Sequence, residues 1–300
     1  MSLTPLDKKA VWRAFDRAAS SYDQHAVLQH EIESRLLERI EFKRFEPGVV
    51  LDLGCGTGSA SHSLARQFKQ AMVIALDWST AMLAETGAGE RAGPGSTGLV
   101  CRINADMHAL PLATRSVDLV FSNLVLPWSY DLPAIFREFR RIMNPDAMLI
   151  FSYFGPDTLY ELKQAWRVVD DFPHVNDYPD MHDIGDELLA AGFREPVMDA
   201  ERLTLQYQDV MSLMRELKGM GAHNVACQRF RGLTGKARLK GMLEAYEKFC
   251  RNDRYPASYE VLYGIAFAPA EGQPVKTPDG DMVTFSVEAL LAGSKHPGSS

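Results

Sequence analysis

The sequence has few cysteines, no long apolar run and no excess of basic charge, and each absence excludes a class of protein. Its four cysteines, Cys55, Cys101, Cys227 and Cys250, include no CxxC pair, so neither a zinc ribbon nor a disulfide framework is expected. No apolar run approaches the roughly 18 residues of a membrane span, and the N-terminus lacks the apolar core of a secretory signal. We therefore expect a cytoplasmic protein without a membrane segment.

Basic charge is too scarce for a dedicated nucleic-acid-binding protein. The 300 residues carry 32 Lys and Arg against 39 Asp and Glu, a net charge of -7 at pH 7, and nucleic acid is therefore not an expected partner. The hydrophobic fraction of 46% is ordinary for a globular protein and excludes wholesale disorder. The eight histidines form no HExxH motif and no i, i+4 pair, so no metal site is predicted.

Strand-like and helix-like segments alternate between residues 49 and 154. Short apolar runs are typical of buried parallel strands, and they occur at 49–53, 72–76, 99–103, 117–122 and 147–153. Helical patterns at 59–69, after Ser79 and at 132–143 separate them, and residues 144–146 (Asn-Pro-Asp) predict a turn. This alternation indicates βαβ units and a parallel sheet covered on both faces.

The flanking segments read as helices with two further strands. Residues 5–42 predict two helices around a polar bend that carries Tyr22. Helical patterns follow at 157–169, 183–191 and, with glycine breaks, 209–250, and strands are expected at 193–207 and 259–268. The tail, 271–300, is rich in Pro, Gly and Ser and is expected to be weakly ordered or a loose hairpin.

The most informative motif is VVLDLGCGTG at residues 49–58. It predicts a strand that runs into a turn whose glycines let the backbone approach a ligand. Asp77 ends the next strand, 25 residues after Asp52, where its carboxylate can accept hydrogen bonds from ribose hydroxyls. Asp106 ends the third, where it can meet an adenine amino group. The GxGxG spacing, rather than GxGxxG, disfavours the pyrophosphate site of a dehydrogenase.

Together these features resemble the class I S-adenosylmethionine-dependent methyltransferases over about residues 45–155. The resemblance implies an α/β, Rossmann-like seven-stranded methyltransferase sheet and S-adenosylmethionine as cofactor. It places Asp77 on the ribose and packs Trp78 and Met82 on the adenine. The residues that it assigns to the cofactor are Asp52, Gly54, Cys55, Gly56, Gly58, Asp77, Trp78, Met82, Ala105, Asp106, Met107 and Asn123.

Segments outside this core resemble a narrower family, the malonyl-acyl-carrier-protein O-methyltransferases of biotin synthesis (the BioC family). The segments are 15–29, 105–128, 154–166, 176–193, 213–224 and 256–269. They are also similar to the hydroxylase-type assembly factors of mitochondrial complex I. The alternatives are therefore a related methyltransferase or hydroxylase-type factor acting on another small molecule or protein, or a non-catalytic assembly factor.

The resemblance also implies a division of the chain. It predicts a single methyltransferase domain over 1–270, followed by the tail. Within it, residues 1–44 form a helical lid, 45–155 the cofactor-binding core, and 156–270 a helical insertion on the substrate side with the last strands. A lid that is short, polar at its bend and tethered at one end is expected to move.

The implied chemistry needs little from the protein beyond positioning. A malonyl carboxylate is already ionised at pH 7, so proximity and exclusion of water suffice, and no catalytic triad is expected. Tyr22 resembles the lid tyrosine of the family and could hydrogen-bond the carboxylate, and Trp128 could form a wall of the acceptor site. Each could equally be a packing residue. A cation near the carboxylate is expected, for which Arg137, Arg140 and Lys163 are candidates.

Charge is unevenly distributed along the chain. Residues 215–254 contain ten basic and four acidic residues, a net charge of +6 in a chain of net charge -7. A basic segment on an acidic protein can attract an acidic partner. Since acyl carrier proteins are acidic, the segment predicts a docking surface for malonyl-acyl-carrier protein, although an ordinary solvated helix face would look the same.

Overall fold

The computed structural model describes residues 5–41, 45–86, 99–129, 131–222, 224–230, 232, 234–272, 274–277 and 280–283. Its helices are α1 (Lys8–Ala18), α2 (Tyr22–His25), α3 (Val27–Glu41), α4 (Ser59–Gln67), α5 (Thr80–Glu85), α6 (Leu132–Ile142), α7 (Tyr160–Arg167), α8 (Met181–Ala190), α9 (Val210–Gly219) and α10 (Lys236–Tyr246). Three short 3-10 helices cover Ala19–Ser21, Leu126–Trp128 and Glu247–Phe249. Within these residues no helix is long and apolar enough to span a bilayer.

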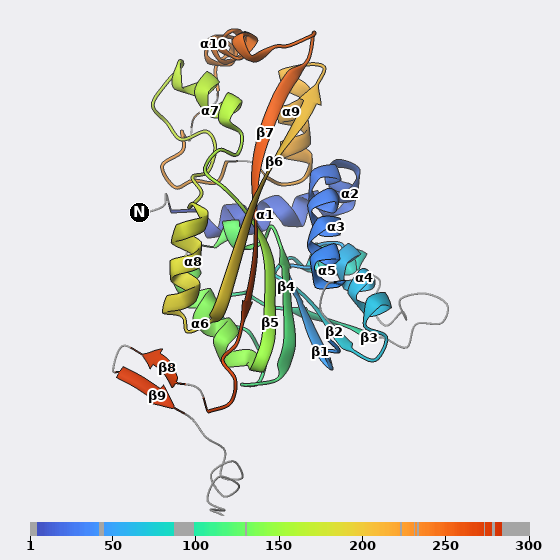
Figure 1. Ribbon diagram of the computed structural model, residues 1–300. Helices are drawn as coiled ribbons and strands as arrows, with labels where there is room; N and C mark the ends of the chain where they lie inside the picture. The colour runs from blue at the N-terminus through green and yellow to red at the C-terminus, as the bar shows by residue number, and fades with distance from the viewer. Residues whose placement is uncertain are drawn as a thin grey trace, which may run out of the picture.

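A seven-stranded sheet forms the centre of the molecule, in the order β3-β2-β1-β4-β5-β7-β6 (Figure 1). The strands are β1 (Val49–Leu53), β2 (Met72–Asp77), β3 (Leu99–Asn104), β4 (Val117–Asn123), β5 (Met143–Phe154), β6 (Arg194–Tyr207) and β7 (Tyr255–Phe267). Strands β1 to β5 are parallel, and β7 and β6 join antiparallel at one edge. The order reverses between β1 and β4, where open α/β sheets form a ligand crevice at their carboxyl ends.

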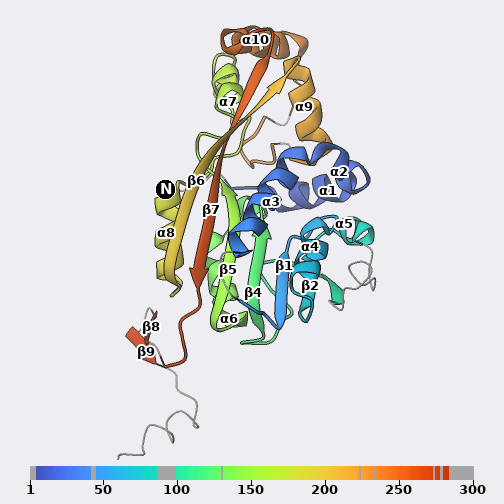
Figure 2. The same cartoon turned by 45° about the vertical axis from the view of Figure 1, so that its right-hand side comes forward.

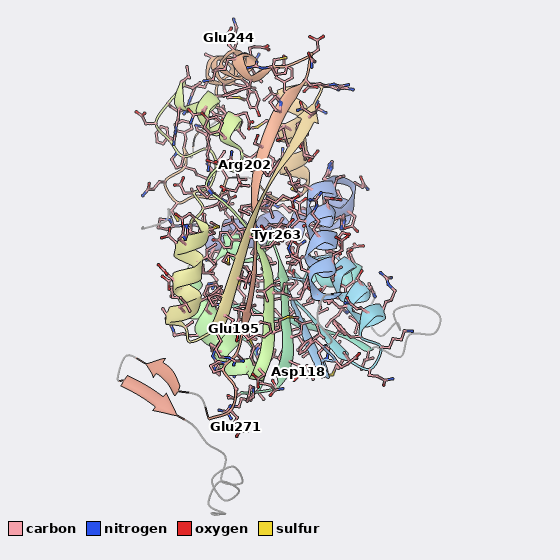
Figure 3. The ribbon with its side chains drawn as sticks, in the orientation of Figure 1. Asp118, Glu195, Arg202, Glu244, Tyr263 and Glu271 are labelled. Atoms are coloured by element: carbon pink, nitrogen blue, oxygen red, sulfur yellow. The ribbon has the colours of Figure 1, made fainter. Side chains whose placement is uncertain are left out.

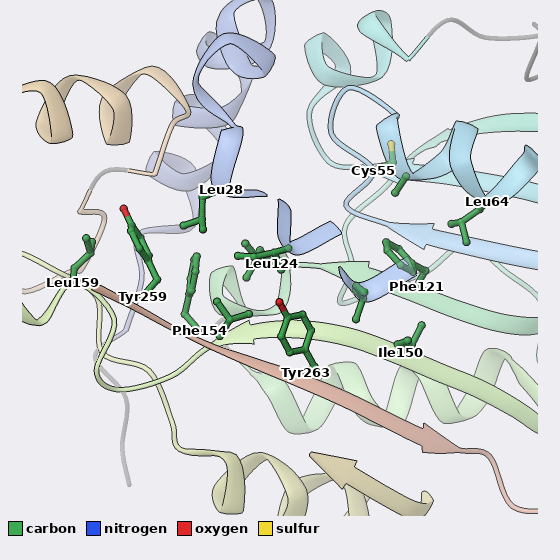
Figure 4. Close-up of a cluster of buried hydrophobic side chains, with 14 of the residues drawn as sticks. Leu28, Cys55, Leu64, Phe121, Leu124, Ile150, Phe154, Leu159, Tyr259 and Tyr263 are labelled. Atoms are coloured by element: carbon green, nitrogen blue, oxygen red, sulfur yellow. The ribbon is translucent and has the colours of Figure 1, made fainter. Parts of the chain in front are cut away.

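Both faces of the sheet are covered by helices because side chains alternate along each strand. In β1, Val50 packs with α3 and α4 in one apolar cluster, while Leu51 packs with α6 and α8 in another. The first cluster continues beyond the sheet (Figure 4), where the rings of Phe154 of β5 and Tyr259 of β7 pack at a tilt with centroids 6.0 Å apart, and Leu28 of α3 lies close by. One core therefore joins the parallel strands to the helices at their carboxyl ends.

The two antiparallel strands are longer than the strands beside them. β5 pairs with β7 only from Val261 onward, whereas β6 pairs with β7 from Tyr255. The extra length is a two-stranded ribbon that projects past the sheet and carries α7, α9 and α10 around it (Figure 1). Figure 3 shows Arg202 on this ribbon and Tyr263 further back along β7.

Helix α7 is fixed to the ribbon by a buried carboxylate. Glu161, 6% exposed, accepts hydrogen bonds from the Ser258 backbone N–H at 2.9 Å and from its hydroxyl at 2.6 Å. The Tyr246 hydroxyl of α10 donates to the Pro256 carbonyl at 2.7 Å. Hydrogen bonds to a buried charged group are among the stronger ones in proteins, so the ribbon holds these helices in a defined position.

The N-terminal helices lie across the carboxyl ends of the parallel strands (Figure 2). The Asp7 side chain caps α1 by accepting from Ala10 N. Asp16 accepts from the Ser79 hydroxyl at 2.8 Å, and Asp23 accepts from the Thr57 hydroxyl at 2.7 Å. The predicted lid segment is thus in contact with the core at several points.

The predicted α/β alternation, the parallel sheet and the last two strands are confirmed, with differences at element boundaries. Residues 144–146 are not a separate turn: they belong to β5, and a register shift in its pairing with β4 accommodates Asp146 at φ 60°. β3 ends at Asn104, so Asp106 follows the strand instead of ending it. The helical pattern predicted at 209–250 is two helices, because α9 ends at Gly219 and α10 begins at Lys236.

Some predictions fall partly outside the described residues. In the tail, β8 (Pro274–Thr277) and β9 (Gly280–Val283) pair as a hairpin, one of the two outcomes expected for this segment. Residues 284–300 and Arg231 of the basic segment lie outside the described part of the chain.

Candidate cofactor and acceptor site

The glycine turn after β1 is bound to the neighbouring strand. The backbone N–H groups of Gly54 and Cys55 both donate to the Leu76 carbonyl of β2, at 2.7 and 3.0 Å. Gly54 has φ +67°, and a Cβ there would overlap the Val125 side chain. Gly56 also has a positive φ, +54°, but a Cβ there would meet nothing within 4 Å, because the turn opens on a cavity at this residue.

Asp77 connects this turn to the start of α5. Its Oδ2 accepts from Gly56 N at 3.0 Å and its Oδ1 accepts from Ser79 N at 2.7 Å. Burial raises the pKa of Asp77, although the backbone N–H groups of Ser79 and Gly56 oppose the rise. Each oxygen retains a lone pair for a ligand, so the carboxylate can accept from two hydroxyls as the sequence predicted.

Asp52 lies behind the turn and is 2% exposed. The Ser61 hydroxyl donates to its Oδ2 at 2.5 Å. The pKa of Asp52 is raised to about 7: burial raises it most, the Ser61 hydrogen bond opposes the rise, and the negative charges of Glu33 and Asp77 add to it. Burial likewise raises the pKa of Glu33, which accepts from the Ser59 hydroxyl at 2.6 Å. A positive charge bound nearby would favour ionisation of all three carboxyls.

A cavity at the carboxyl ends of β1, β2 and β4 brings most of the predicted site residues together. It encloses about 950 Å³ of empty space, counting its open mouth. The predicted residues that line it are Tyr22, Gly54, Gly56, Asp77, Trp78, Met82, Ala105, Met107, Asn123 and Trp128. Asp52, Cys55, Gly58 and Asp106 are not among its lining residues.

Comparison with known proteins agrees with this geometry. Residues 51–151 match the family model described as a methyltransferase domain. The malonyl-acyl-carrier-protein O-methyltransferase of Gallionella capsiferriformans is 48% identical over 88% of this chain and 92% of its own, and that of Methylovorus sp. is 46% identical over 92% and 93%. The chain belongs to this methyltransferase family. A Bacillus halodurans structure titled a putative methyltransferase shares the fold, with a TM-score of 0.56 at 15% identity over 79% of this chain and 100% of that one.

The residues of this methyltransferase fit S-adenosylmethionine, the cofactor of the fold. The cofactor carries a sulfonium and an ammonium, and three carboxyls with raised pKa values lie at or behind the turn. Gln29 of α3 also lines the cavity, and its Oε1 is buried without a hydrogen-bond partner among the described residues. An unpartnered buried acceptor is unfavourable, so it suits a ligand that brings N–H donors.

Asp106 does not line the cavity in this structure, and its carboxylate contacts Lys8 and His108. Its Oδ2 accepts from the Lys8 ammonium of α1 at 2.6 Å, and its Oδ1 accepts from His108 N at 3.0 Å. Burial acts to raise the pKa of Asp106, but Lys8 and His108 outweigh it and hold the pKa below its usual value. In this conformation the carboxylate joins α1 to the core, while its neighbours Ala105 and Met107 face the cavity.

Tyr22 and Trp128 enter the cavity from different elements. Burial, followed by the charges of Asp77 and Glu33, raises the pKa of the Tyr22 hydroxyl, so it stays protonated as a hydrogen-bond donor. Trp128 follows β4 and meets Phe15 of α1 edge to face, with ring centroids 5.0 Å apart. The rings of Phe15 and Trp128 form an apolar wall on the side of the cavity covered by α1.

Several cavity residues were not identified from the sequence. Trp12 and Phe15 of α1, Gln29 of α3, and Phe154 at the end of β5 all line it. Val11 and Phe15 of α1, which both line the cavity, are four residues apart and so share one helix face. The cations suggested for the acceptor carboxylate lie elsewhere: no Lys or Arg is among the described residues that line the cavity, and Lys163 donates to the Pro156 carbonyl at 2.9 Å.

The raised pKa of Asp52 predicts pH-dependent cofactor binding. Below pH 7 the carboxyl is largely protonated, and a cationic ligand that favours its ionised form must release that proton. Affinity for S-adenosylmethionine should therefore increase from pH 6 to pH 8, by about tenfold for each unit by which binding lowers the pKa. Calorimetry in two buffers of different ionisation enthalpy measures both the affinity and the released proton.

The control for this prediction is Asp52→Asn. It should bind weakly at every pH and release less proton, with Glu33 and Asp77 supplying the remainder. Proton release equal to that of the unmodified protein would show that Asp52 is not the titrating group. In the free protein the folded pKa of Asp52 lies above its unfolded value of about 4, so its contribution to stability should decrease as pH rises from about 4 through 7.

Proposed function

We propose that this methyltransferase esterifies the free carboxylate of a malonyl thioester carried by acyl carrier protein, a step of biotin synthesis. The observation that carries the proposal is the extent of similarity to the relatives of that name. It spans 88% of the chain at 48% identity, whereas the methyltransferase-domain match ends at residue 151. The similarity therefore includes the helical insertion beside the acceptor side of the cavity.

The site has the features that a base-free reaction needs. Bound S-adenosylmethionine supplies an electrophilic methyl group and leaves as a neutral thioether. The acceptor carboxylate is ionised at neutral pH, and none of the cavity side chains is required to remove a proton. The aromatic wall of Phe15 and Trp128 excludes water, and a dry pocket favours the meeting of carboxylate and sulfonium. We place the reaction in the cytoplasm, which accords with the four free cysteines.

The proposed activity is tested in a reaction with purified components. Purified protein, S-adenosylmethionine and malonyl-acyl-carrier protein should give the methyl ester, detected by mass spectrometry, with a rate nearly constant from pH 7.5 to 9 once cofactor is saturating. Expression should also restore growth without biotin to a strain that lacks its own malonyl methyltransferase. Cofactor binding without ester formation would point to another acceptor, and absence of cofactor binding would favour a non-catalytic assembly factor.

Tyr22 is proposed to donate a hydrogen bond to the acceptor carboxylate. Tyr22→Phe removes the donor but keeps the ring, and should lower kcat about tenfold, the loss expected for one hydrogen bond to a charged group, while the affinity for S-adenosylmethionine changes less than twofold. Steady-state kinetics with calorimetry separate these effects. Equal losses in kcat and cofactor affinity would instead make Tyr22 a closing residue of the cofactor pocket.

The basic segment 215–254 is proposed as the docking surface for the acidic carrier protein. Its charge is partly neutralised: Arg238 pairs with Asp170, and Lys240 pairs with Glu244 at 3.6 Å. Figure 3 shows Glu244, on α10, at the end of the molecule farthest from the tail hairpin. Lys236 and Lys240 are exposed on α10 and leave this end accessible to a partner.

Charge reversal tests the docking surface. The double variant Lys236→Glu and Lys240→Glu should raise KM for malonyl-acyl-carrier protein about fivefold at low salt, with a smaller effect at high salt, and leave KM for malonyl pantetheine unchanged. A matched reversal at the end of α4 and just beyond it, Arg66→Glu with Lys69→Glu, should change neither constant. If the α10 variant keeps its KM for the carrier protein, the carrier docks elsewhere.

A further inference from the structure

A second, larger cavity lies on the opposite side of α1 from the cofactor cavity. It encloses about 2550 Å³ of empty space, counting its open mouth. Along α1, Val11 and Phe15 line the first cavity, and Arg13 and Arg17 line the second. The helix is therefore a partition with one apolar face and one face that carries cations.

The two cavities meet at the edge of this partition. Ala222, which follows α9, lines both of them. Phe154 of the first cavity packs on Tyr178 of the second, with ring centroids 5.6 Å apart. Because the two linings share a residue and are in contact here, a ligand in the second cavity could place its end close to the first.

The rim of the second cavity is basic. Its lining cations include Arg13 and Arg17 of α1 and Lys218 of α9, and each is exposed. None of these three forms an ion pair with any residue that the structure describes. Asp7, the one acidic residue among the described residues of the lining, pairs with Arg229 at 3.4 Å. The uncompensated charge makes the rim suitable for an anionic group, and phosphate oxygens are well matched to guanidinium groups.

The interior of the second cavity is apolar, with an unpartnered acceptor. Leu162 and Trp166 of α7 and Met214 of α9 form its walls. Asn176 is only 7% exposed, lines the same cavity, and its Oδ1 has no hydrogen-bond partner among the described residues. Since a buried acceptor without a partner is unfavourable, the site is suited to a ligand that carries an N–H group into an apolar channel.

We propose that the second cavity binds the phosphopantetheine-type arm that carries the acyl group, with its phosphate at the Arg13, Arg17 and Lys218 rim and an amide N–H on Asn176. A flexible chain that carries a phosphate, amides and a thioester has a group for each of these features. The thioester end then reaches the cofactor cavity beside Ala222. This proposal rests on the proposed function, because it concerns the same acceptor.

A binding site for the arm, away from the reacting carboxylate, would make the enzyme prefer malonyl thioesters that carry the full arm. Binding energy from a remote part of a substrate can be used to position the reacting part. Thioesters with the full arm should therefore have a lower KM than thioesters without it, and the difference should depend on residues of the second cavity alone.

The phosphate end is tested with three acceptors: malonyl phosphopantetheine, malonyl pantetheine and malonyl ethanethioester. The unmodified enzyme should have a KM about tenfold lower for the first than for the second. In the double variant Arg13→Gln and Arg17→Gln this ratio should fall to about one, while the constants for the ethanethioester stay unchanged. The α10 variant, Lys236→Glu with Lys240→Glu, is the matched control and should keep the full ratio.

The amide end is tested with Asn176→Leu, which has a similar volume and no polar group. The variant should raise KM for malonyl pantetheine about fivefold and leave the ethanethioester constants unchanged. Its melting temperature is measured alongside, because the variant removes both the unpartnered Oδ1 and the side-chain hydrogen bond between Asn176 and Tyr178. A lower melting temperature with equal losses for both acceptors would make Asn176 structural and overturn its role.

The outcomes distinguish the arm site from the function itself. If the unmodified enzyme methylates all three acceptors without preference for the phosphate, or if the Arg13 and Arg17 variant keeps the preference, the arm binds elsewhere and the proposal is wrong. If the unmodified enzyme methylates none of the malonyl thioesters, including the carrier-bound one, the proposed function itself is wrong.

Discussion

The site depends on the two hydrogen bonds that the Asp77 carboxylate accepts from the N–H groups of Gly56 and Ser79. They connect the turn after β1 to the start of α5 and fix the opening between β1 and β2. Helix α1 then attaches to the same place, since Asp16 accepts from the Ser79 hydroxyl. The Asp77 carboxylate thus helps to hold the wall of the cofactor cavity and, through Ser79, helix α1, which separates the two cavities.

The fold and the cofactor end of the site could be predicted because their signals are local in sequence. A glycine turn after an apolar strand constrains its own backbone, and Asp77 follows its strand directly, so neither depends on distant residues. Parallel strands bring their carboxyl ends to one edge, which is why Gly56, Asp77 and Asn123 line one cavity. The contacts of Asp106 were less predictable, because its carboxylate accepts a hydrogen bond from Lys8, which lies 98 residues away in the sequence.

The acceptor side could not be predicted because it is made by long-range packing. Gln29, Phe154 and Met220 come together only through the placement of α3, β5 and the ribbon. The basic segment shows the limit of counting charges: its net charge is visible in the sequence, but the pairing of Arg238 with Asp170 is not. At the second cavity Arg13 and Arg17 have no ion-pair partner among the described residues, and both lie outside that segment.

Helix α1 contributes to both cavities, and this shared wall has a thermodynamic consequence. A ligand on either face favours the position of α1 that completes its own site. Because that position also completes the other site, each ligand should increase the affinity for the other by the same factor, as reciprocal linkage requires. The position of α1 would then favour the complex that holds both ligands over complexes that hold only one.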